Sequence, residues 1–305
     1  AQMGADVIRF DNIGGGLDAR RAPLTKDNNS IYWAGWNKGK RSIMVDLFSD
    51  EGRVLLSELI SVPGSDIGLF LTNLPMRGWL DYETLSLRRK DLIAISIVGS
   101  SDGRSAVDYT VNAASGFPHI NGSTSDKFPL NNPLPVWDML AGNAAATGLL
   151  AAERYRSRTQ KGQVIHLALT DIAFNAVANS GITAEIQVNG NQRGYNGNDI
   201  YGSYGHDFET ADKRRVMIVA VTTRMWKNLL NATDLNQTFK DFSDKENIDI
   251  SDEHVRYDCR KEITKILQPW FLARKLKEIE TKLTEHSVCW EKFQTFSQLI
   301  NEDPR

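Results

Sequence analysis

Short apolar runs that alternate with helical patterns constrain the fold of this chain more than any other feature. Five runs, rich in aliphatic and β-branched residues and bounded by polar residues or glycine, predict buried strands. They are residues 5–11, 42–48, 66–72, 92–99 and 163–170. Helical patterns lie between them at 49–60, with Ser49 or Asp50 as the cap, at 81–90 and at 137–158. Strands that alternate with helices predict a Rossmann-like α/β domain with a mainly parallel sheet.

A second, smaller domain is predicted after a segment crowded with glycine and asparagine. Residues 187–205 show no hydrophobic period, which indicates a domain junction. We therefore expect a large α/β domain at residues 1–190, and a linker with a small α+β domain at residues 191–305. In the smaller domain, residues 214–222 predict one strand, and the segment 252–300 carries apolar residues at helical spacing.

The charge balance and the rare residue types exclude several classes of function. With 36 Lys and Arg against 38 Asp and Glu, the chain has no overall field that would attract nucleic acid or an anionic membrane. No apolar run is long enough to span a bilayer, so we expect a cytoplasmic protein. Cys259 and Cys289 are far apart, and the histidines show no ligand spacing, so reduced thiols and no metal are predicted.

Asp138 stands before a long run of small helix formers, in the stretch LPVWDMLAG. A carboxylate in the first turn of a helix interacts favourably with the free N–H groups there, so helix capping alone explains its presence. The small residues from Ala141 to Gly148 also allow a neighbour to approach the helix closely. That neighbour is either another part of the fold or a slender ligand, and the pattern leaves both open.

Two basic segments could meet phosphate groups. Lys38, Lys40 and Arg41 precede the second predicted strand, either as a solvated turn or as a phosphate contact. Residues 14–23 follow the first strand, but their glycine spacing does not match the dinucleotide fingerprint, which leaves a surface loop or a phosphate contact. No GxSxG motif occurs, so a serine hydrolase is not supported.

Eight segments, in order, resemble the family III CoA-transferases, the group that includes formyl-CoA transferase and α-methylacyl-CoA racemase. They are GADVIRFDNIGGG, NKGKRSIMVDL with DEGRVLL, TNLPMRGWLDYETL, DLIAISIVG, YTVNAASG, WDMLAG, GLLAAERYRSRTQKGQVIHLAL and HDFETADKRRVMIVAVTTRMW. The likeness covers residues 4–305. The segments GGGLDARR, WAGWNKGKRSI, TNLPMRGWLDYETL and YGHDFET resemble most the branch that moves CoA between the two carboxyl groups of one methyl-branched unsaturated dicarboxylate. An intermolecular acyl-CoA:carboxylate CoA-transferase and a non-catalytic acyl-CoA binder are the alternatives.

The resemblance implies a nucleophile and a CoA path. Asp138 matches the catalytic aspartate of the family, which forms a mixed anhydride with the acyl group and keeps it reactive. Asn73, Leu74, Arg77 and Tyr109 match or lie close to positions that contact CoA. No cofactor is implied beyond CoA as part of the substrate. We expect the helix N-terminus to keep Asp138 ionised despite burial.

Departures from the family pattern bear on activity and on phosphate binding. The racemases carry a histidine where this chain has Val107, so racemisation lacks an acid/base group. Two basic family residues are replaced by Asn12 and Phe48, and other cations are then expected to meet the CoA phosphates. The candidates are Arg20, Arg21, Lys38 and Lys40.

The resemblance also implies features of the assembled protein. Family members carry a further βα unit before residue 1 and a returning segment after residue 305, so the chain is expected to be a fragment. Interlocked homodimers are expected. Since either acyl intermediate would hydrolyse in a wet site, a cover from residues 196–205 is predicted, with Gly202 and Gly205 as mobile points. Backbone N–H groups near Gly142 or in that cover are the candidate oxyanion donors.

Overall fold

The computed structural model describes residues 1–123 and 125–305, and these form two compact units. Unit 1 comprises Ala1–Val111 and Leu134–Ser180, and unit 2 comprises Asn112–Pro133 and Gly181–Arg305. The predicted domain boundary near residue 190 stays a prediction about the organisation of the whole protein.

Unit 1 contains parallel strands, as predicted, but they form two sheets. β1 (Ile8–Asp11) pairs with β2 (Arg41–Met44). The other sheet has the order β3-β4-β5, formed by β3 (Leu69–Thr72), β4 (Ile93–Val98) and β5 (Gln163–Ala168). All five predicted strands are therefore present, each shorter than its apolar run. β4 is the buried central strand, because its side chains from 93 to 96 are covered on both faces.

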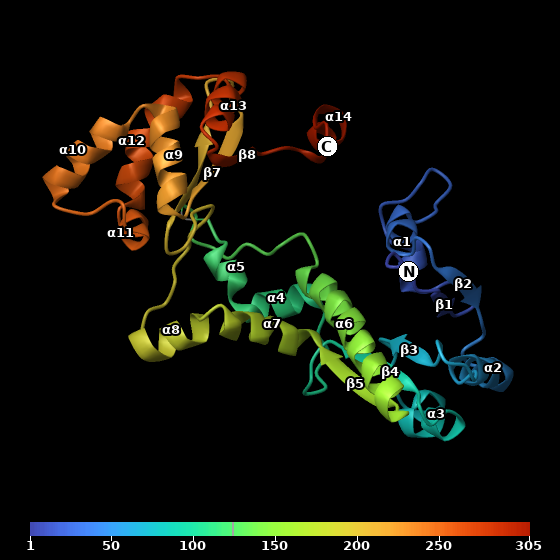
Figure 1. The fold of residues 1–305 in the computed structure, drawn as a ribbon. Helices are drawn as coiled ribbons and strands as arrows, with labels where there is room; N and C mark the ends of the chain where they lie inside the picture. The colour runs from blue at the N-terminus through green and yellow to red at the C-terminus, as the bar shows by residue number, and fades with distance from the viewer. Residues whose placement is uncertain (124) are drawn as a thin grey trace. The chain divides into compact units, whose positions relative to one another are not determined.

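The helices of unit 1 include three close to the ranges predicted at 49–60, 81–90 and 137–158, together with others for which no range was predicted. They are η1 (Leu17–Arg20), α1 (Ile31–Trp36), α2 (Asp50–Ile60), η2 (Gly78–Leu80), α3 (Tyr82–Arg88), α6 (Val136–Thr159) and α7 (Leu169–Asn179), while α4 (Asp108–Ser115) begins in this unit. The expected cap of α2 is confirmed, because the Ser49 hydroxyl accepts a hydrogen bond from the Gly52 N–H at 3.0 Å. α6 runs alongside β4 and β5 and also contacts α7 (Figure 1).

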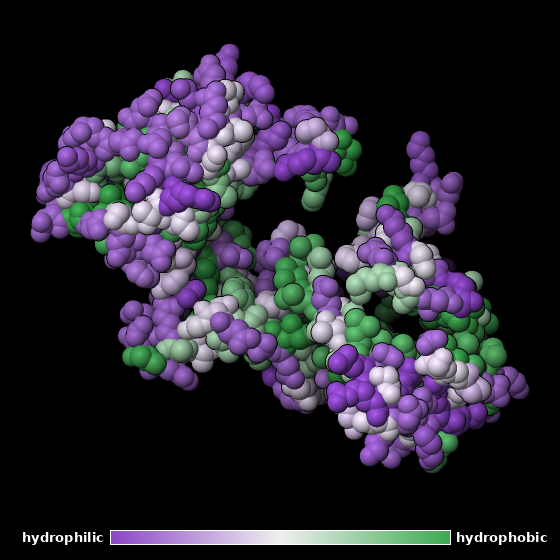
Figure 2. Space-filling view, viewed as in Figure 1, coloured by the Kyte–Doolittle hydropathy of each residue, from purple (hydrophilic) through white to green (hydrophobic). Residues whose placement is uncertain are grey.

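The small residues of α6 form its packed face. Ala141, Ala145 and Ala152 are almost completely buried, whereas Leu140 and Leu150 are exposed on the same helix. Figure 2 shows hydrophobic residues at the surface over α6 and over α2. The parts of the fold that lie against α6 are β4, β5 and α7. Within the described residues no helix is both long and apolar enough to cross a membrane.

A buried arginine fixes the far end of α6. The Arg156 guanidinium is 4% exposed and donates from Nη1 to the carbonyl oxygen of Ile67 at 2.8 Å. It also lies 3.8 Å from the Asp91 carboxylate. A buried cation is tolerated only when its donors are satisfied, so these contacts hold the loop before β3 against α6.

Unit 2 is an antiparallel sheet packed against helices. Its sheet has the order β6-β7-β8, formed by β6 (Tyr204–Glu209), β7 (Arg215–Ala220) and β8 (Cys289–Lys292). Its helices are α5 (Phe117–Ile120), α8 (Ile182–Asn189), α9 (Thr223–Thr233), α10 (Asn236–Glu246), α11 (Glu253–Asp258), α12 (Arg260–Leu272), α13 (Leu276–Glu285) and α14 (Phe296–Glu302). One core joins the three strands with α9, α10, α12 and α13, and in it α12 lies against β6 and α9 against β7.

The sequence predicts one of these three strands. The expectation of continuous helical spacing over 252–300 is wrong at β8, which interrupts it. This strand is short, lies at the sheet edge and has alternately exposed and half-buried residues, so it lacks the apolar run that identifies a strand.

Candidate functional site

Asp138 lies beyond the carboxyl end of β5, on the side of the sheet where α/β proteins bind ligands. Only residues 160–162 separate α6 from β5, so the helix runs back along the strand in the opposite direction. The 24 residues of α6 span about 36 Å and the six of β5 about 20 Å, so the first turn of α6 reaches past the carboxyl end of β5. Ligands of open parallel sheets bind outside the carboxyl ends of the strands.

Asp108, and not Asp138, caps α6. The residue at the N-cap is Pro135, which offers no side-chain acceptor. Instead the carboxylate oxygen Oδ2 of Asp108 accepts hydrogen bonds from the backbone N–H of Trp137 at 2.7 Å and of Asp138 at 3.1 Å. The expectation that Asp138 itself caps the helix is therefore wrong. The Asp138 carboxylate accepts no hydrogen bond from any residue that the structure describes, so both of its oxygens are available to a substrate.

The first N–H groups of α6 are all engaged. The Val136 N–H donates to the Leu134 carbonyl at 2.8 Å, and the Met139 N–H donates to the Pro135 carbonyl at 3.1 Å. The two N–H groups between them bond to Asp108. Gly142 lies further along, where each N–H bonds to the carbonyl four residues earlier. This arrangement favours an oxyanion donor outside the first turns of α6, and the oxyanion role of Gly142 stays a prediction.

The charges around Asp138 oppose its ionisation. Partial desolvation by the surrounding protein raises the pKa of Asp138 above its usual value, and the negative charge of Asp108 raises it further. Arg21 lowers this pKa and Asp18 raises it, both to a smaller extent. The helix N-terminus offers less stabilisation to this charge than expected, because Asp108 already accepts hydrogen bonds from the N–H groups of Trp137 and Asp138, and the ionised state of Asp138 stays a prediction. The Asp138 side chain is also exposed rather than buried.

The predicted CoA contacts follow neighbouring strands. Asn73 comes directly after β3, and the Leu74 N–H donates to the Thr72 hydroxyl at 2.9 Å, which fixes this turn. Arg77 precedes η2, and Tyr109 is the second residue of α4, which follows β4. Since β3 and β4 are parallel neighbours, their carboxyl ends share one edge of the sheet. Contact of these residues with CoA stays a prediction.

The predicted phosphate contacts have different surroundings. Arg21 stacks 4.3 Å from the ring centre of Tyr32 and pairs with Asp18 at 3.5 Å. The charge of Arg21 also lowers the pKa of Asp138, whereas contact of Arg21 with a phosphate stays a prediction. Arg20 ends η1 and is exposed.

Among the basic residues before β2, Lys40 has a defined hydrogen-bond partner. The Lys40 ammonium donates to the side-chain oxygen of Asn37 at 2.9 Å, and Arg9 donates to the same oxygen at 3.2 Å. Burial and the charge of Arg9 lower the pKa of Lys40. Lys38 is exposed nearby, and Arg41 pairs with Asp6 at 2.5 Å. Their roles in phosphate binding stay predictions.

The segment predicted as a cover has a defined structure within unit 2. The Asn196 N–H donates to the Ile120 carbonyl at 2.9 Å, and the Ile200 N–H donates to the Gly205 carbonyl at 3.1 Å. A side chain on Gly205 would meet Ile200 at 2.4 Å, so close packing accounts for this glycine. Gly202 has φ +77°, a conformation that glycine adopts readily. A covering motion of this segment stays a prediction.

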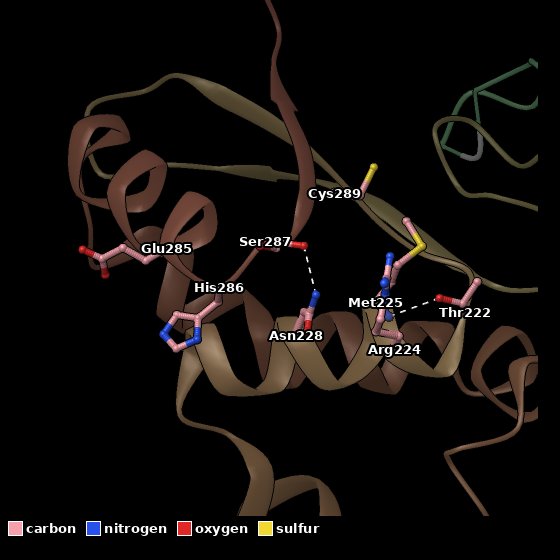
Figure 3. A pocket seen from close by; sticks show the side chains of 8 residues that line it. All are labelled: Thr222, Arg224, Met225, Asn228, Glu285, His286, Ser287 and Cys289. Atoms are coloured by element: carbon pink, nitrogen blue, oxygen red, sulfur yellow. Dashed lines mark hydrogen bonds between the residues drawn. The ribbon is translucent and has the colours of Figure 1, made fainter.

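A groove of about 560 Å³ lies in unit 2 (Figure 3). The residues that line it are Thr222, Arg224, Met225, Asn228, Glu285, His286, Ser287 and Cys289. The Asn228 side-chain amide donates to the Ser287 carbonyl at 3.0 Å, which ties α9 to the end of α13. None of the residues predicted for catalysis or CoA binding is among these, so the groove is not the candidate active site.

Asp108 is the residue that sequence reasoning missed. Its local pattern, an aspartate at the start of an eight-residue helix, predicts no more than a favourable first turn for α4. The contact that matters joins positions 29 and 30 residues apart. A clue lies in its neighbour, because Val107 occupies the position where the racemases of the resembling family carry histidine.

Comparison with known proteins agrees with this geometry. The family model described as CoA-transferase family III matches residues 1–304. The 2-methylfumaryl-CoA isomerase of Chloroflexus aurantiacus is 45% identical over 305 residues, covering 100% of this chain and 75% of that protein. The succinyl-CoA:mesaconate CoA-transferase of Haloarcula hispanica is 29% identical over 258 residues, covering 80% of this chain and 64% of that protein.

A solved structure shows the same fold. The crystal structure of a CaiB/BaiF family protein from Brucella suis superposes with a TM-score of 0.76 at 21% identity, covering 98% of this chain and 79% of that one. From the family model and the relatives together, the chain belongs to CoA-transferase family III.

Proposed function

We propose that this protein moves CoA between the two carboxyl groups of one methyl-branched unsaturated dicarboxylate, the isomerisation of 2-methylfumaryl-CoA. The observation that carries the proposal is the 45% identity over the whole chain to an enzyme named for that reaction. The geometry supports it, because an exposed carboxylate without a hydrogen-bond partner among the described residues stands at the ligand-binding edge of a parallel sheet.

The first half of the reaction loads the acyl group and then CoA onto the enzyme. A carboxylate oxygen of Asp138 attacks the thioester carbonyl carbon, the carbon–sulfur bond breaks, and CoA leaves as the thiolate. The product is a mixed anhydride, which keeps the acyl group activated where a serine ester would not. The thiolate then attacks the Asp138 carbonyl carbon of the anhydride. The bond from the Asp138 carbonyl carbon to the bridging oxygen breaks, the free dicarboxylate stays in the site, and an aspartyl-CoA thioester forms.

The second half reverses these steps with the other carboxyl group. The second carboxylate of the same dicarboxylate attacks the aspartyl thioester and expels the thiolate, which forms a new anhydride. The thiolate attacks the acyl carbonyl carbon, and Asp138 leaves as the free carboxylate. No proton or electron is gained or lost over the cycle. Asp138 must be ionised at the start, so the groups that set its pKa also set the pH range of activity.

Isotope labelling tests the intramolecular route. The protein is given 2-methylfumaryl-CoA together with labelled free mesaconate, and the product thioester is analysed for label. The proposal expects product without label, because the dicarboxylate never leaves the site. Substantial incorporation would instead favour an intermolecular CoA-transferase, the second candidate, which the similarity to the Haloarcula enzyme supports.

Two variants test the nucleophile. Asp138→Ala and Asp138→Asn are expected to abolish turnover while CoA still binds, since neither side chain can form the anhydride. Normal turnover in either variant contradicts the role of Asp138. Loss of turnover together with loss of CoA binding would point to damage of the site and requires a check of folding by circular dichroism.

The remaining features of the assembled enzyme belong to the same proposal. We infer an interlocked homodimer in the cytoplasm, with CoA as the only organic group that the protein binds besides the acyl chain. Light scattering coupled to size exclusion measures the mass of the assembly. A monomeric and fully active protein would contradict the dimer.

A further inference from the structure

Asp108 is a buried acidic residue that links two helix starts. Asp108 is 3% exposed and is the first residue of α4. Its Oδ2 atom also takes the N–H groups at the second and third positions of α6, which is the bonding pattern of an N-cap side chain. Here the cap comes from another helix, because the residue at the N-cap position is Pro135.

The contact reaches the candidate nucleophile directly. One of the two N–H donors, at 3.1 Å, is the backbone of Asp138 itself. A shift of this carboxylate would therefore move the backbone that carries the attacking oxygen. Misplacement by about 1 Å costs on the order of 100-fold in rate where reacting atoms must align.

The contact also has an electrostatic side. A negative charge on Asp108 disfavours the negative form of Asp138, so Asp138 holds its proton more strongly. The charged groups that act on Asp138 are Asp108 from the start of α4, and Arg21 and Asp18 from the segment of η1. The direction of the Asp138 pKa agrees, since Asp108 is the leading charge that raises it. A more basic carboxylate is a stronger nucleophile once ionised.

We propose that Asp108 is a positioning residue for Asp138: its carboxylate holds the first turn of α6 through the backbone N–H groups of Trp137 and Asp138, and its negative charge acts on the attacking carboxylate. This inference rests on the proposed function, because it assigns Asp108 a part in the reaction of Asp138. It differs from an ordinary helix cap, which would stabilise α6 without acting on the titration of its neighbour.

Three variants separate the two effects. Asp108→Asn keeps a side-chain oxygen that accepts the N–H groups but removes the charge. Asp108→Ala removes both. Asp102→Asn is the matched control, since Asp102 lies on the loop between β4 and α4, pairs with Arg104 at 2.6 Å and accepts a hydrogen bond from Ser100 at 2.7 Å.

The main readout is the titration of the Asp138 carboxyl carbon by 13C NMR. The resonance is assigned by its loss in Asp138→Asn, and the measurement needs no turnover. We expect Asp138 to titrate at lower pH in Asp108→Asn than in the unaltered protein. In Asp102→Asn it should titrate at the same pH as in the unaltered protein. A titration in Asp108→Asn that coincides with the unaltered protein overturns the proposal.

Kinetics provides the second readout. The acid limb of kcat is expected to move to lower pH in Asp108→Asn, and Asp108→Ala is expected to lose about 100-fold in kcat with little change in KM. Full kcat in Asp108→Ala overturns the positioning role. If Asp108→Ala does not fold, Asp108→Asn still decides the question. Turnover that survives in Asp138→Asn would refute the proposed function and leave the NMR result on Asp108 standing.

Discussion

Replacing Gly205 with alanine tests how the segment predicted as a cover is built. The new Cβ would lie 2.4 Å from Cδ1 and 2.6 Å from Cγ1 of Ile200, far inside van der Waals contact. Ile200 is half-buried, and its Cβ, which the backbone fixes through the Ile200 N–H bond to the Gly205 carbonyl, would lie 3.1 Å from the new atom, so a change of rotamer relieves only part of the clash. Overpacking of this kind costs about 1–3 kcal/mol, and we expect that loss in the free energy of unfolding.

A double-mutant cycle identifies the cause. In an Ile200→Ala background the clashing atoms are gone, so Gly205→Ala should cost clearly less than in the unaltered protein. Gly202→Ala is the control, because a Cβ there meets nothing within 4 Å and its cost comes only from the backbone at φ +77°. That cost, about 1–2 kcal/mol, should be equal in both backgrounds. Urea unfolding followed by tryptophan fluorescence measures all six proteins. An equal cost of Gly205→Ala in both backgrounds would refute the packing argument.

Three further results are expected. Turnover at saturating substrate should fall as the pH drops through a value above the usual aspartate pKa, because the raised pKa of Asp138 lets it take up a proton at higher pH. A kcat that stays constant down through the usual aspartate range contradicts this. Arg21→Gln removes a charge that lowers this pKa, so the acid limb of kcat should move to higher pH, and a limb that stays in place would exclude the contact. Arg156→Met should lower the free energy of unfolding by about 1–3 kcal/mol in urea, because the Ile67 carbonyl loses its donor, whereas exposed Arg154→Met should change little; equal effects would contradict the buried contact.

The sequence predicts the elements of this fold better than their connections. Strands β3 to β5 and helix α2 are recognised because hydrophobic period and capping are local signals, as the Ser49 hydroxyl shows. The separation of the parallel strands into two sheets is not visible in any single segment. Edge strand β8 is not predicted, because it lacks the apolar run by which a strand is recognised.

The candidate site shows the same difference between local signals, which the sequence predicts, and contacts between distant residues, which it does not. Asp138 is found from the pattern of its helix and from resemblance to a family. Its partner Asp108 is not, because the hydrogen bonds that join them cross 30 residues of chain. Desolvation and the charge of Asp108 both raise the pKa of Asp138, and the part played by Asp108 cannot be predicted from the local sequence.

Trapping the acyl enzyme tests the central claim most directly. The protein is mixed with 2-methylfumaryl-CoA and quenched with hydroxylamine, which converts an activated aspartyl carbonyl to a hydroxamate, and its peptides are then mapped by mass spectrometry. The account predicts a hydroxamate at residue 138 that depends on substrate and is absent from Asp138→Asn. An active protein that yields no hydroxamate at this position, or one on a different carboxylate, would contradict it.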